Sequence, residues 1–212
     1  KSKKPKEIVK DIQKIAKELN YSGIIGVGFP GIVKNGVINT SANLHKDWVG
    51  AKLAKMIEDE TGNKAYILND ADAAGMAEFR FGTEEARNAN VVLFLTIGTG
   101  IGSALFVEGK LLQNTELGHM LLGKFEVEQY ASAAVKTREK LTWKQWAVRF
   151  NEGLKAYEFL LNPDIFILGG GVSARFDKFS QYLTVKTKVI PAKLENLAGI
   201  IGAAVAAQEK LN

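Results

Sequence analysis

The sequence has 212 residues, of which 46% are hydrophobic and 24% charged, which is typical of a folded globular chain and excludes a disordered or fibrous one. Its 28 basic and 23 acidic residues leave a net charge of +5, which favours an anionic partner, whether a phosphate ester, polyphosphate or nucleic acid. The lack of cysteine excludes disulfides and thiolate metal sites and fits a cytoplasmic protein. No apolar run reaches the roughly 18 residues of a membrane span, and no signal peptide is expected.

Apolar periodicity predicts alternating helices and strands along the first part of the chain. The expected elements are a helix over 8–19, a strand over 24–28, a hairpin around Asn35-Gly36, a helix over 49–57 with Gly62 as its C-cap, a strand over 65–68 and an alanine-rich helix over 71–79. A polar segment from 82 to 90 predicts a boundary between two lobes, placed between residues 80 and 91.

The remaining part of the chain continues the same alternation. The expected elements are a strand over 91–97, a glycine turn over 98–102, extended segments over 103–107 and 110–112, a helix over 143–161, a strand over 165–168, a helix entered at Ser173, a strand over 184–190 and a helix over 198–211. Strands that alternate with helices predict an α/β fold with a mixed or parallel sheet.

The turn Gly98-Thr-Gly-Ile-Gly102 follows the clearest buried strand. Glycines allow backbone N–H groups to surround an anion. The G-x-G-x-G spacing differs from the G-x-G-x-x-G dinucleotide motif, no helix follows, and no G-x-x-x-x-G-K-[ST] motif occurs. The pattern therefore favours a phosphate loop between two strands, and a tight hairpin without a ligand remains the alternative.

Asp70 is expected at the carboxyl end of a strand, where ligands of α/β sheets bind. A carboxylate there can take the proton from a hydroxyl that attacks a phosphoryl group. The alternative is that Asp70 is a plain helix N-cap. Asp72 is expected in the first helical turn, where it complements the helix dipole.

Glu116 and His119 are three residues apart, so one turn can present both to a polyol, and Glu128 can reach the same sugar. A structural histidine and a solvated glutamate are the alternatives. Gly169-Gly-Gly171 ends a strand and can admit a nucleotide base or a phosphate, or it is a tight turn with Ser173 as N-cap. Lys186, Lys188 and Lys193 form either a solvated face or a track for a phosphate chain.

Several segments together resemble the ROK sugar-kinase family of the actin/hexokinase superfamily, and within it the polyphosphate glucokinases. The segments are Gly26-Val-Gly-Phe-Pro-Gly31, Leu68-Asn-Asp-Ala-Asp-Ala-Ala-Gly-Met-Ala-Glu78, 95–106, Asn114-Thr-Glu-Leu-Gly-His119, Leu141-Thr-Trp-Lys-Gln-Trp146, Leu168-Gly-Gly-Gly-Val-Ser173 and 189–200. They occur in order over nearly the whole chain, which makes the resemblance more specific than any single segment.

The resemblance implies an actin/hexokinase-like (ribonuclease H-like) fold with two lobes around a cleft, the N-terminal one ending at residue 85 (1–85) and the C-terminal one covering 86–212. It implies a glucokinase that phosphorylates the 6-hydroxyl of glucose with Asp70 as the catalytic base. The expected sugar-binding residues are Asn69, Glu116, His119, Glu128 and Asn43. The expected donor-binding residues are Thr96, Gly98, Thr99, Gly100, Gly102, Gly169, Gly170 and Gly171.

The resemblance also sets expectations for cofactors and partners. The donor is expected to be polyphosphate or ATP, with Mg²⁺ bridging donor oxygens, because the turn carries no lysine. No residue of this sequence is assigned as a metal ligand, and no zinc is expected, because the cysteine-rich motif of many ROK proteins is absent. A homodimer is expected, with neither nucleic acid nor membrane as partner. The family's N-terminal Asp-x-Gly-Gly-Thr hairpin is also absent, so we expect an incomplete record of a longer protein.

Two other functions stay open. The first is a sugar-sensing ROK repressor without kinase activity, which requires a helix-turn-helix before residue 6. The second is an actin-like or chaperone ATPase that binds no sugar, against which Glu116 and His119 argue.

Overall fold

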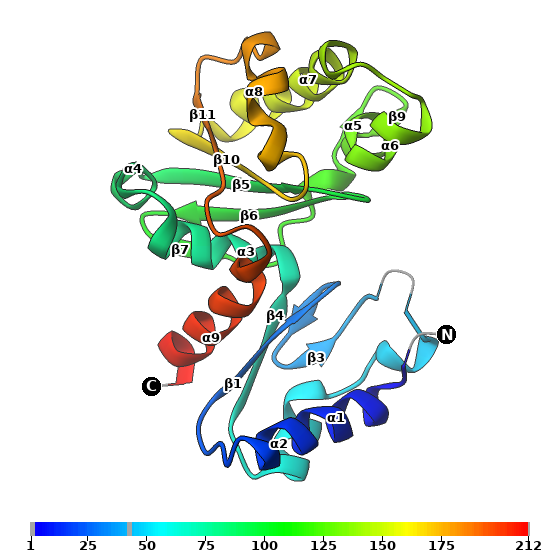
Figure 1. Ribbon diagram of the computed structural model, residues 1–212, viewed down its shortest axis with the longest axis vertical. Helices are drawn as coiled ribbons and strands as arrows, with labels where there is room; N and C mark the ends of the chain where they lie inside the picture. The colour runs from blue at the N-terminus through cyan, green and yellow to red at the C-terminus, as the bar shows by residue number, and fades with distance from the viewer. Residues whose placement is uncertain (1–2, 42–43, 212) are drawn as a thin grey trace. The chain divides into compact units, whose positions relative to one another are not determined.

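The computed structural model describes residues 3–41 and 44–211 and divides into two compact units (Figure 1). One unit consists of Lys1–Ala77 together with Ala198–Asn212, and the other of Glu78–Leu197. The division therefore falls between Ala77 and Glu78, and the C-terminal helix belongs with the first unit rather than with the second. The functions given to lobes 1–85 and 86–212 stay a prediction.

The first unit is built on two parallel strands, β1 (Ile25–Phe29) and β4 (Ala65–Asn69). Helices α1 (Pro5–Glu18) and α2 (Leu53–Thr61) contact each other, and β2 (Val33–Lys34) pairs with β3 (Val37–Ile38). The buried core residues that these elements share are Val9, Phe29, Val33, Ile38, Trp48, Leu53, Ile57, Ala65 and Ile67.

Turn chemistry in this unit follows the sequence closely. Asn35 and Gly36 both have left-handed φ angles, 52° and 72°, as a type I′ hairpin requires. Gly62 ends α2 with φ 73°, which confirms the predicted C-cap. The predicted start of α2 is wrong, because Val49 lies outside the helix and follows a 3₁₀ turn, Lys46–Trp48.

The apolar face of α1 is only partly covered. Ile8 and Ile12 pack against the core, whereas Ile15 and Leu19 are 54% and 71% exposed. The periodicity of the sequence therefore predicted the helix correctly, but not how far its apolar side is buried.

The C-terminal helix α9 (Ala198–Leu211) packs on α3 (Asp70–Ala77) and on β1 through small residues. A Cβ atom at Gly202 would overlap the backbone carbonyl of Ala73, and one at Gly26 would overlap that of Ala203. Glycine is thus required at both positions by close backbone approach. The alanines on this face of α9 are therefore buried inside the unit.

The second unit contains a five-stranded mixed sheet in the order β11-β10-β5-β6-β7. Its strands are β5 (Val91–Ile97), β6 (Ile101–Val107), β7 (Lys110–Leu112), β10 (Ile165–Gly169) and β11 (Lys188–Pro191). β11, β10 and β5 run parallel, and β6 is antiparallel to both of its neighbours, β5 and β7. The strand expected over 184–190 is shorter and lies further along the chain.

Helix α7 (Trp143–Leu161) supplies the core on one face of this sheet. Its buried residues Trp146, Phe150, Leu154 and Tyr157 pack in one cluster with residues of β5 and β10. The helix begins at the capping box of Thr142 and Gln145 and ends at Asn162 in the left-handed conformation. Both its range and its apolar side were predicted.

Short elements of the second unit were not predicted. They are the π-helical turn Glu78–Gly82, α4 (Glu84–Asn88), the 3₁₀ turn Leu117–His119, β8 (Leu121–Leu122), β9 (Phe125–Glu126), α5 (Val127–Ala131), α6 (Ala133–Arg138) and the 3₁₀ turns Ser180–Tyr182 and Glu195–Leu197. The helix expected at Ser173 is a 3₁₀ turn, Ser173–Arg175, followed by a four-residue α8 (Phe176–Phe179). The Ser173 hydroxyl donates to Gly170 O at 2.8 Å and makes no N-cap bond.

Within the described ranges, no helix is both long and apolar enough to cross a membrane.

Candidate active site

Asp70 stands at the junction where β4 becomes α3. The cap of this helix is the preceding residue, Asn69, whose Oδ1 accepts hydrogen bonds from Ala71 N at 2.8 Å and Asp72 N at 3.1 Å. The Asn69 Nδ2 donates to Gly31 O at 3.3 Å. Because Asn69 satisfies the helix end, the interpretation of Asp70 as the plain N-cap is wrong.

The Asp70 carboxylate keeps an exposed side and accepts a hydrogen bond from Ala71 N at 2.9 Å. Loss of hydration at the junction raises the pKa of this carboxyl above its ordinary value, and backbone N–H groups offset part of that rise. A raised pKa makes a carboxylate a better proton acceptor. Asp72 lies in the first turn of α3 as expected, but it is fully buried.

The glycine turn joins β5 to β6 as an antiparallel hairpin, as the sequence predicted. A Cβ atom at Gly98 would meet nothing within 4 Å, and neither Gly98 nor Gly100 has a left-handed φ angle. The backbone therefore does not require glycine at Gly98. Its missing side chain leaves open space beside the turn, which is what the close approach of a phosphate needs.

Glu128 links this turn to the residues expected to hold the sugar. Its Oε2 accepts a hydrogen bond from Ile101 N at 3.2 Å, and a side chain at Gly100 would collide with that same oxygen. A side chain at Gly100 would therefore have to displace that carboxylate. Ala134 N, in the first turn of α6, donates to Gly98 O at 3.3 Å and holds the other end of the turn.

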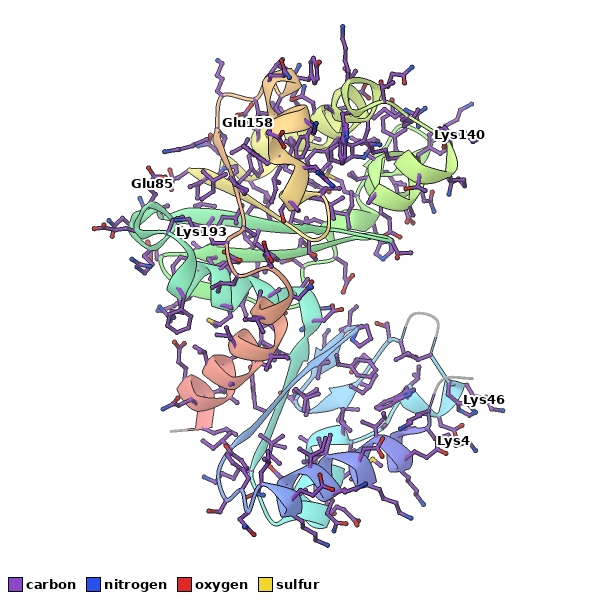
Figure 2. All side chains as sticks on the ribbon, in the orientation of Figure 1. Lys4, Lys46, Glu85, Lys140, Glu158 and Lys193 are labelled. Carbon is purple, nitrogen blue, oxygen red and sulfur yellow. The ribbon has the colours of Figure 1, made fainter. Side chains whose placement is uncertain are left out.

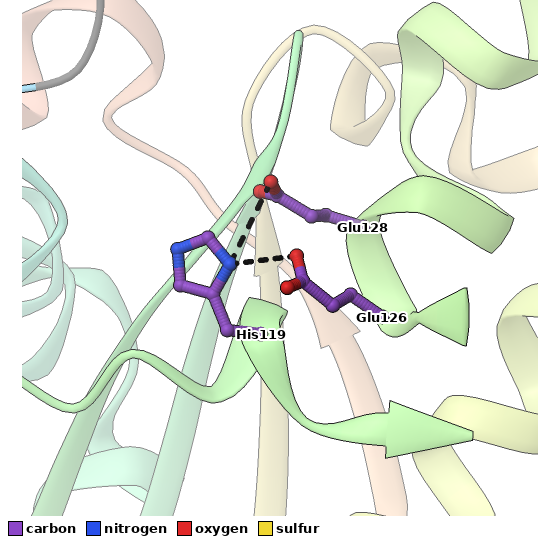
Figure 3. Close-up of side chains that lie close together, drawn as sticks. All are labelled: His119, Glu126 and Glu128. Carbon is purple, nitrogen blue, oxygen red and sulfur yellow. Dashed lines mark hydrogen bonds and ion pairs between the residues drawn. The ribbon is translucent and has the colours of Figure 1, made fainter. Parts of the chain in front are cut away.

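Three carboxylates lie around the ring of His119, and two of them, those of Glu126 and Glu128, are drawn in Figure 3. Its Nδ1 lies 2.9 Å from Glu126 Oε2 and 3.8 Å from Glu128 Oε1. Its Nε2 lies 3.9 Å from Glu116 Oε2. The structure therefore brings together Glu116, His119 and Glu128, as the sequence predicted, and adds Glu126, which the sequence analysis missed.

The carboxylates change the acid–base behaviour of His119. The hydrogen bond to Glu126 raises the pKa of the imidazole most, and the charges of Glu128, Glu126 and Glu116 add to this rise against a smaller desolvation effect. The charged, doubly protonated ring is thereby stabilised to higher pH. In that state Nε2 carries a proton and can donate to a hydroxyl oxygen.

The turn that carries His119 is fixed to the sheet and to α7. Leu117 N donates to Ser103 Oγ at 3.1 Å, and the Ser103 hydroxyl donates to Thr115 O. The Tyr157 hydroxyl donates to Leu117 O at 2.7 Å, and burial raises the pKa of that hydroxyl. The histidine is therefore presented by a backbone with little freedom.

The structure supports a ligand-binding role less clearly for the other residues predicted to bind the phosphoryl donor. Gly169 packs its open side on the Phe94 ring, and Gly170, with φ 79°, lies against the backbone of Ile97. Both glycines are explained by packing at the end of β5, whereas a Cβ at Gly171 would meet nothing within 4 Å. Thr96 is the β5 residue paired with Gly102. Asn43 lies outside the described residues.

The lysines expected as a phosphate track are engaged in part. Lys188 Nζ lies 2.6 Å from Glu85, and the Glu158 carboxylate accepts a hydrogen bond from Thr187 N at 2.6 Å. Figure 2 labels the two glutamates. The hydrogen bond from Thr187 lowers the pKa of Glu158 most, and the positive charge of Lys186 adds to this effect. Carboxylates beside these lysines reduce the positive charge that they could offer to a polyanion, which argues against a phosphate track.

The described residues do not form a cage for the expected Mg²⁺. Their one group of clustered ligand-type atoms is His119, Glu126 and Glu128, within 4.8 Å of one another. There, His119 Nδ1 is hydrogen-bonded to Glu126 and offers no lone pair to a cation.

Comparison with known proteins defines the class of fold first. The chain superposes on an inorganic polyphosphate/ATP-glucomannokinase from Arthrobacter sp. strain KM with a TM-score of 0.87 and 37% identity, covering 97% of this chain and 84% of that one. The fold is the actin/hexokinase-like fold of sugar kinases. A model of the ROK family matches residues 2–136, and the chain belongs to that family.

One curated relative and one further solved structure complete the comparison. The chain is 43% identical to the polyphosphate glucokinase of Mycobacterium tuberculosis strain H37Rv over 203 residues, which is 95% of this chain and 76% of that protein. A ROK transcriptional regulator, described as a homologue of the E. coli MLC protein, shares the fold with a TM-score of 0.75 at 15% identity, covering 96% of this chain and 68% of that one. That second likeness concerns the fold alone.

Proposed function

We propose that this protein is a glucokinase that transfers a phosphoryl group from inorganic polyphosphate or ATP to the 6-hydroxyl of glucose. The observation that carries the proposal is the 43% identity to a polyphosphate glucokinase over 95% of the chain. The grouping of Glu116, His119 and Glu128 next to an open glycine turn supports it independently.

The proposed reaction is an in-line displacement. The bond from the sugar O6 to phosphorus forms while the phosphorus–oxygen bond to the rest of the donor breaks. The hydroxyl proton passes to the Asp70 carboxylate, and the product is glucose 6-phosphate with ADP or a polyphosphate one unit shorter. Positioning and electrostatics supply most of the acceleration, because the protein forms no covalent intermediate.

The chain's own residues have distinct parts in this proposal. Glu116, His119 and Glu128 hold the sugar through hydrogen bonds to its hydroxyls, with Asn69 and Asn43 as further contacts. The backbone of the turn at 98–102, with Thr96 and Thr99, receives the donor phosphates, and Gly169, Gly170 and Gly171 line the donor side. Mg²⁺ bound together with the donor would neutralise the charge that builds up during transfer.

The test is formation of glucose 6-phosphate by the full-length protein with Mg²⁺, using long-chain polyphosphate and ATP in parallel, and mannose as a second acceptor. Product formation with at least one donor supports the kinase. Glucose binding without product from either donor would favour a sugar sensor, and the absence of glucose binding would favour an ATPase without a sugar. The expected homodimer and cytoplasmic location belong to the same proposal, and light scattering of the full-length protein tests the dimer.

A further inference from the structure

We propose that Glu126 is a positioning residue of the sugar site, which holds the Nδ1–H of His119 so that the ring presents Nε2 to a sugar hydroxyl. The inference rests on the proposed function, because it assigns the purpose of the ring to sugar binding. It concerns a residue that none of the sequence motifs pointed to.

A small hairpin brings Glu126 back to His119. β8 and β9 pair with Leu121 opposite Glu126, and Gly123, with φ 63°, makes the tight turn between them. Val127 N also donates to Met120 O at 3.0 Å. Residues that follow His119 directly in the chain are therefore tied to residues that flank Glu126, which fixes the distance between the two side chains.

Glu126 is the carboxylate that bonds to the ring. The distance from His119 Nδ1 to Glu126 Oε2 is 2.9 Å, within the range of a charge-assisted hydrogen bond, whereas Glu128 Oε1 is 3.8 Å away. Glu128 also accepts from Ile101 N in the glycine turn. The two glutamates therefore have different roles, since Glu126 orients the histidine and Glu128 belongs to the turn.

The hydrogen bond decides which ring nitrogen carries the proton. An ionised carboxylate only accepts, so Nδ1 must be the protonated nitrogen in the neutral ring as well as in the charged ring. Nε2 lies on the ring edge that faces away from Glu126 and Glu128 (Figure 3). That nitrogen is the one presented to a ligand.

A hydroxyl placed beside Nε2 and Glu116 can bridge them. Their separation of 3.9 Å is too long for a direct hydrogen bond. A sugar hydroxyl placed there can donate to the Glu116 carboxylate and accept from Nε2–H of the charged ring. The pKa of His119, raised by Glu126 and by the charges of Glu128 and Glu116, keeps the ring charged to higher pH. Sugar binding should therefore weaken when the pH rises through that pKa.

The test uses three variants of the full-length protein, Glu126→Ala, Glu126→Gln and Gln129→Ala. Glu126 is also the N-cap of α5 and forms a capping box with Gln129, in which Glu126 N donates to Gln129 Oε1 at 3.4 Å. Gln129→Ala breaks that box without touching the Glu126 carboxylate and serves as the control for helix capping. The imidazole nitrogens are followed by ¹⁵N NMR in the absence of sugar. His45 is the other histidine of the sequence and serves as the internal reference. The KM and kcat for glucose are then measured against pH.

We expect Glu126→Ala to lower the pKa of His119, to mix its two neutral tautomers and to raise the KM for glucose about tenfold, the order for one lost charge-assisted hydrogen bond, with a smaller effect on kcat. Glu126→Gln should recover part of the KM, because its amide oxygen accepts from Nδ1–H. The pH above which the KM rises should still be lower in Glu126→Gln than in the wild type, because the amide lacks the negative charge of the carboxylate. Gln129→Ala should match the wild type in all these measurements.

The proposal would be overturned if His119 kept its wild-type tautomer in Glu126→Ala and if the pH dependence of the KM did not change. An equal rise of KM in Gln129→Ala would also overturn it, because the effect would then come from the helix end. A wild-type protein that forms no glucose 6-phosphate would overturn the proposed function, and the sugar-binding role with it, whereas the NMR titration would still decide whether Glu126 holds the ring.

Discussion

Asn69 and Asp70 are neighbours in the chain, and the helix that follows uses them differently. Asn69 accepts hydrogen bonds from two peptide N–H groups at the start of the helix, so the Asp70 carboxylate is not needed as the main cap. It remains partly exposed at the end of β4, while loss of hydration raises its pKa. The raised pKa suits the proposed role of Asp70 as the base, and it comes at a cost to stability.

This arrangement predicts the pH dependence of Asp70. Because burial disfavours its ionised form in the fold, the stability contribution of Asp70 is full below the ordinary pKa of 3.8 and is lost as the pH rises through the raised value. The rate should fall when the pH drops through the same raised pKa, since the base must be ionised. The acid limb of kcat against pH should therefore lie above 3.8.

Asp70→Asn should reduce kcat by roughly 10²- to 10⁴-fold, the usual contribution of a general base, and leave glucose binding largely intact. At neutral pH its melting temperature should rise, because the neutral amide avoids the cost of the buried charge. Asp59→Asn, at an exposed position paired with Lys55, is the control and should keep wild-type kcat. Wild-type turnover in Asp70→Asn would exclude Asp70 as the base.

At the scale of elements, two turns contain glycine for different physical reasons. Gly98 has open space beside it and an ordinary backbone, whereas Gly170 has φ 79° and lies against the Ile97 backbone. The first glycine is therefore available for a ligand, and the second is required by packing.

Gly98→Ala should therefore keep the melting temperature of the wild type but raise the KM for the phosphoryl donor, because its methyl group fills the open side of the turn. Gly170→Ala should instead unfold at lower temperature. Thermal unfolding and donor kinetics on both variants test this difference. A Gly98→Ala variant with an unchanged KM for both polyphosphate and ATP would leave the turn as a plain hairpin.

The contact of α9 with α3 gives a second prediction for an element. Gly202→Ala should lower the free energy of unfolding by about 1–3 kcal/mol, because the added Cβ would overlap the Ala73 carbonyl. Gly199→Ala in the same helix meets nothing within 4 Å and should be neutral or stabilising by up to about 1 kcal/mol. Urea unfolding of both variants measures the difference, and equal effects would contradict the close packing.

Sequence patterns predicted the elements whose apolar spacing is long and regular. The strands at 91–97 and 165–168 and the helix at 143–161 are examples, since each contributes a run of buried apolar residues. The five- and six-residue helices α5 and α6 were missed because they are too short to show a period. The local signs of α4 are its cap, Thr83, and the two glutamates of its first turn, Glu84 and Glu85.

Predictions for the site followed the same physical limits. The positions of Asp70 at a strand end and of Glu116 beside His119 were predicted, because strand ends and one helical turn place side chains predictably, and their roles stay predictions. Glu126 was missed because its proximity to His119 depends on the β8–β9 hairpin, which pairs only two residues on each side. Glu85 beside Lys188 was missed too, because a contact across 103 positions leaves no pattern in the sequence.

The molecule as a whole combines a ROK-family fold with a histidine set among three carboxylates beside an open glycine turn. The net charge of +5 favours an anionic donor but does not distinguish polyphosphate from ATP, since both are polyanions. The choice of donor therefore has to be measured directly.

The most direct measurement is formation of glucose 6-phosphate by the full-length protein with Mg²⁺ and either long-chain polyphosphate or ATP, in parallel with Asp70→Asn. We predict product with polyphosphate, and with ATP as a second donor, and near-complete loss of product in the variant. No product from either donor, in a protein that still binds glucose, would contradict the proposed kinase and identify a sugar sensor.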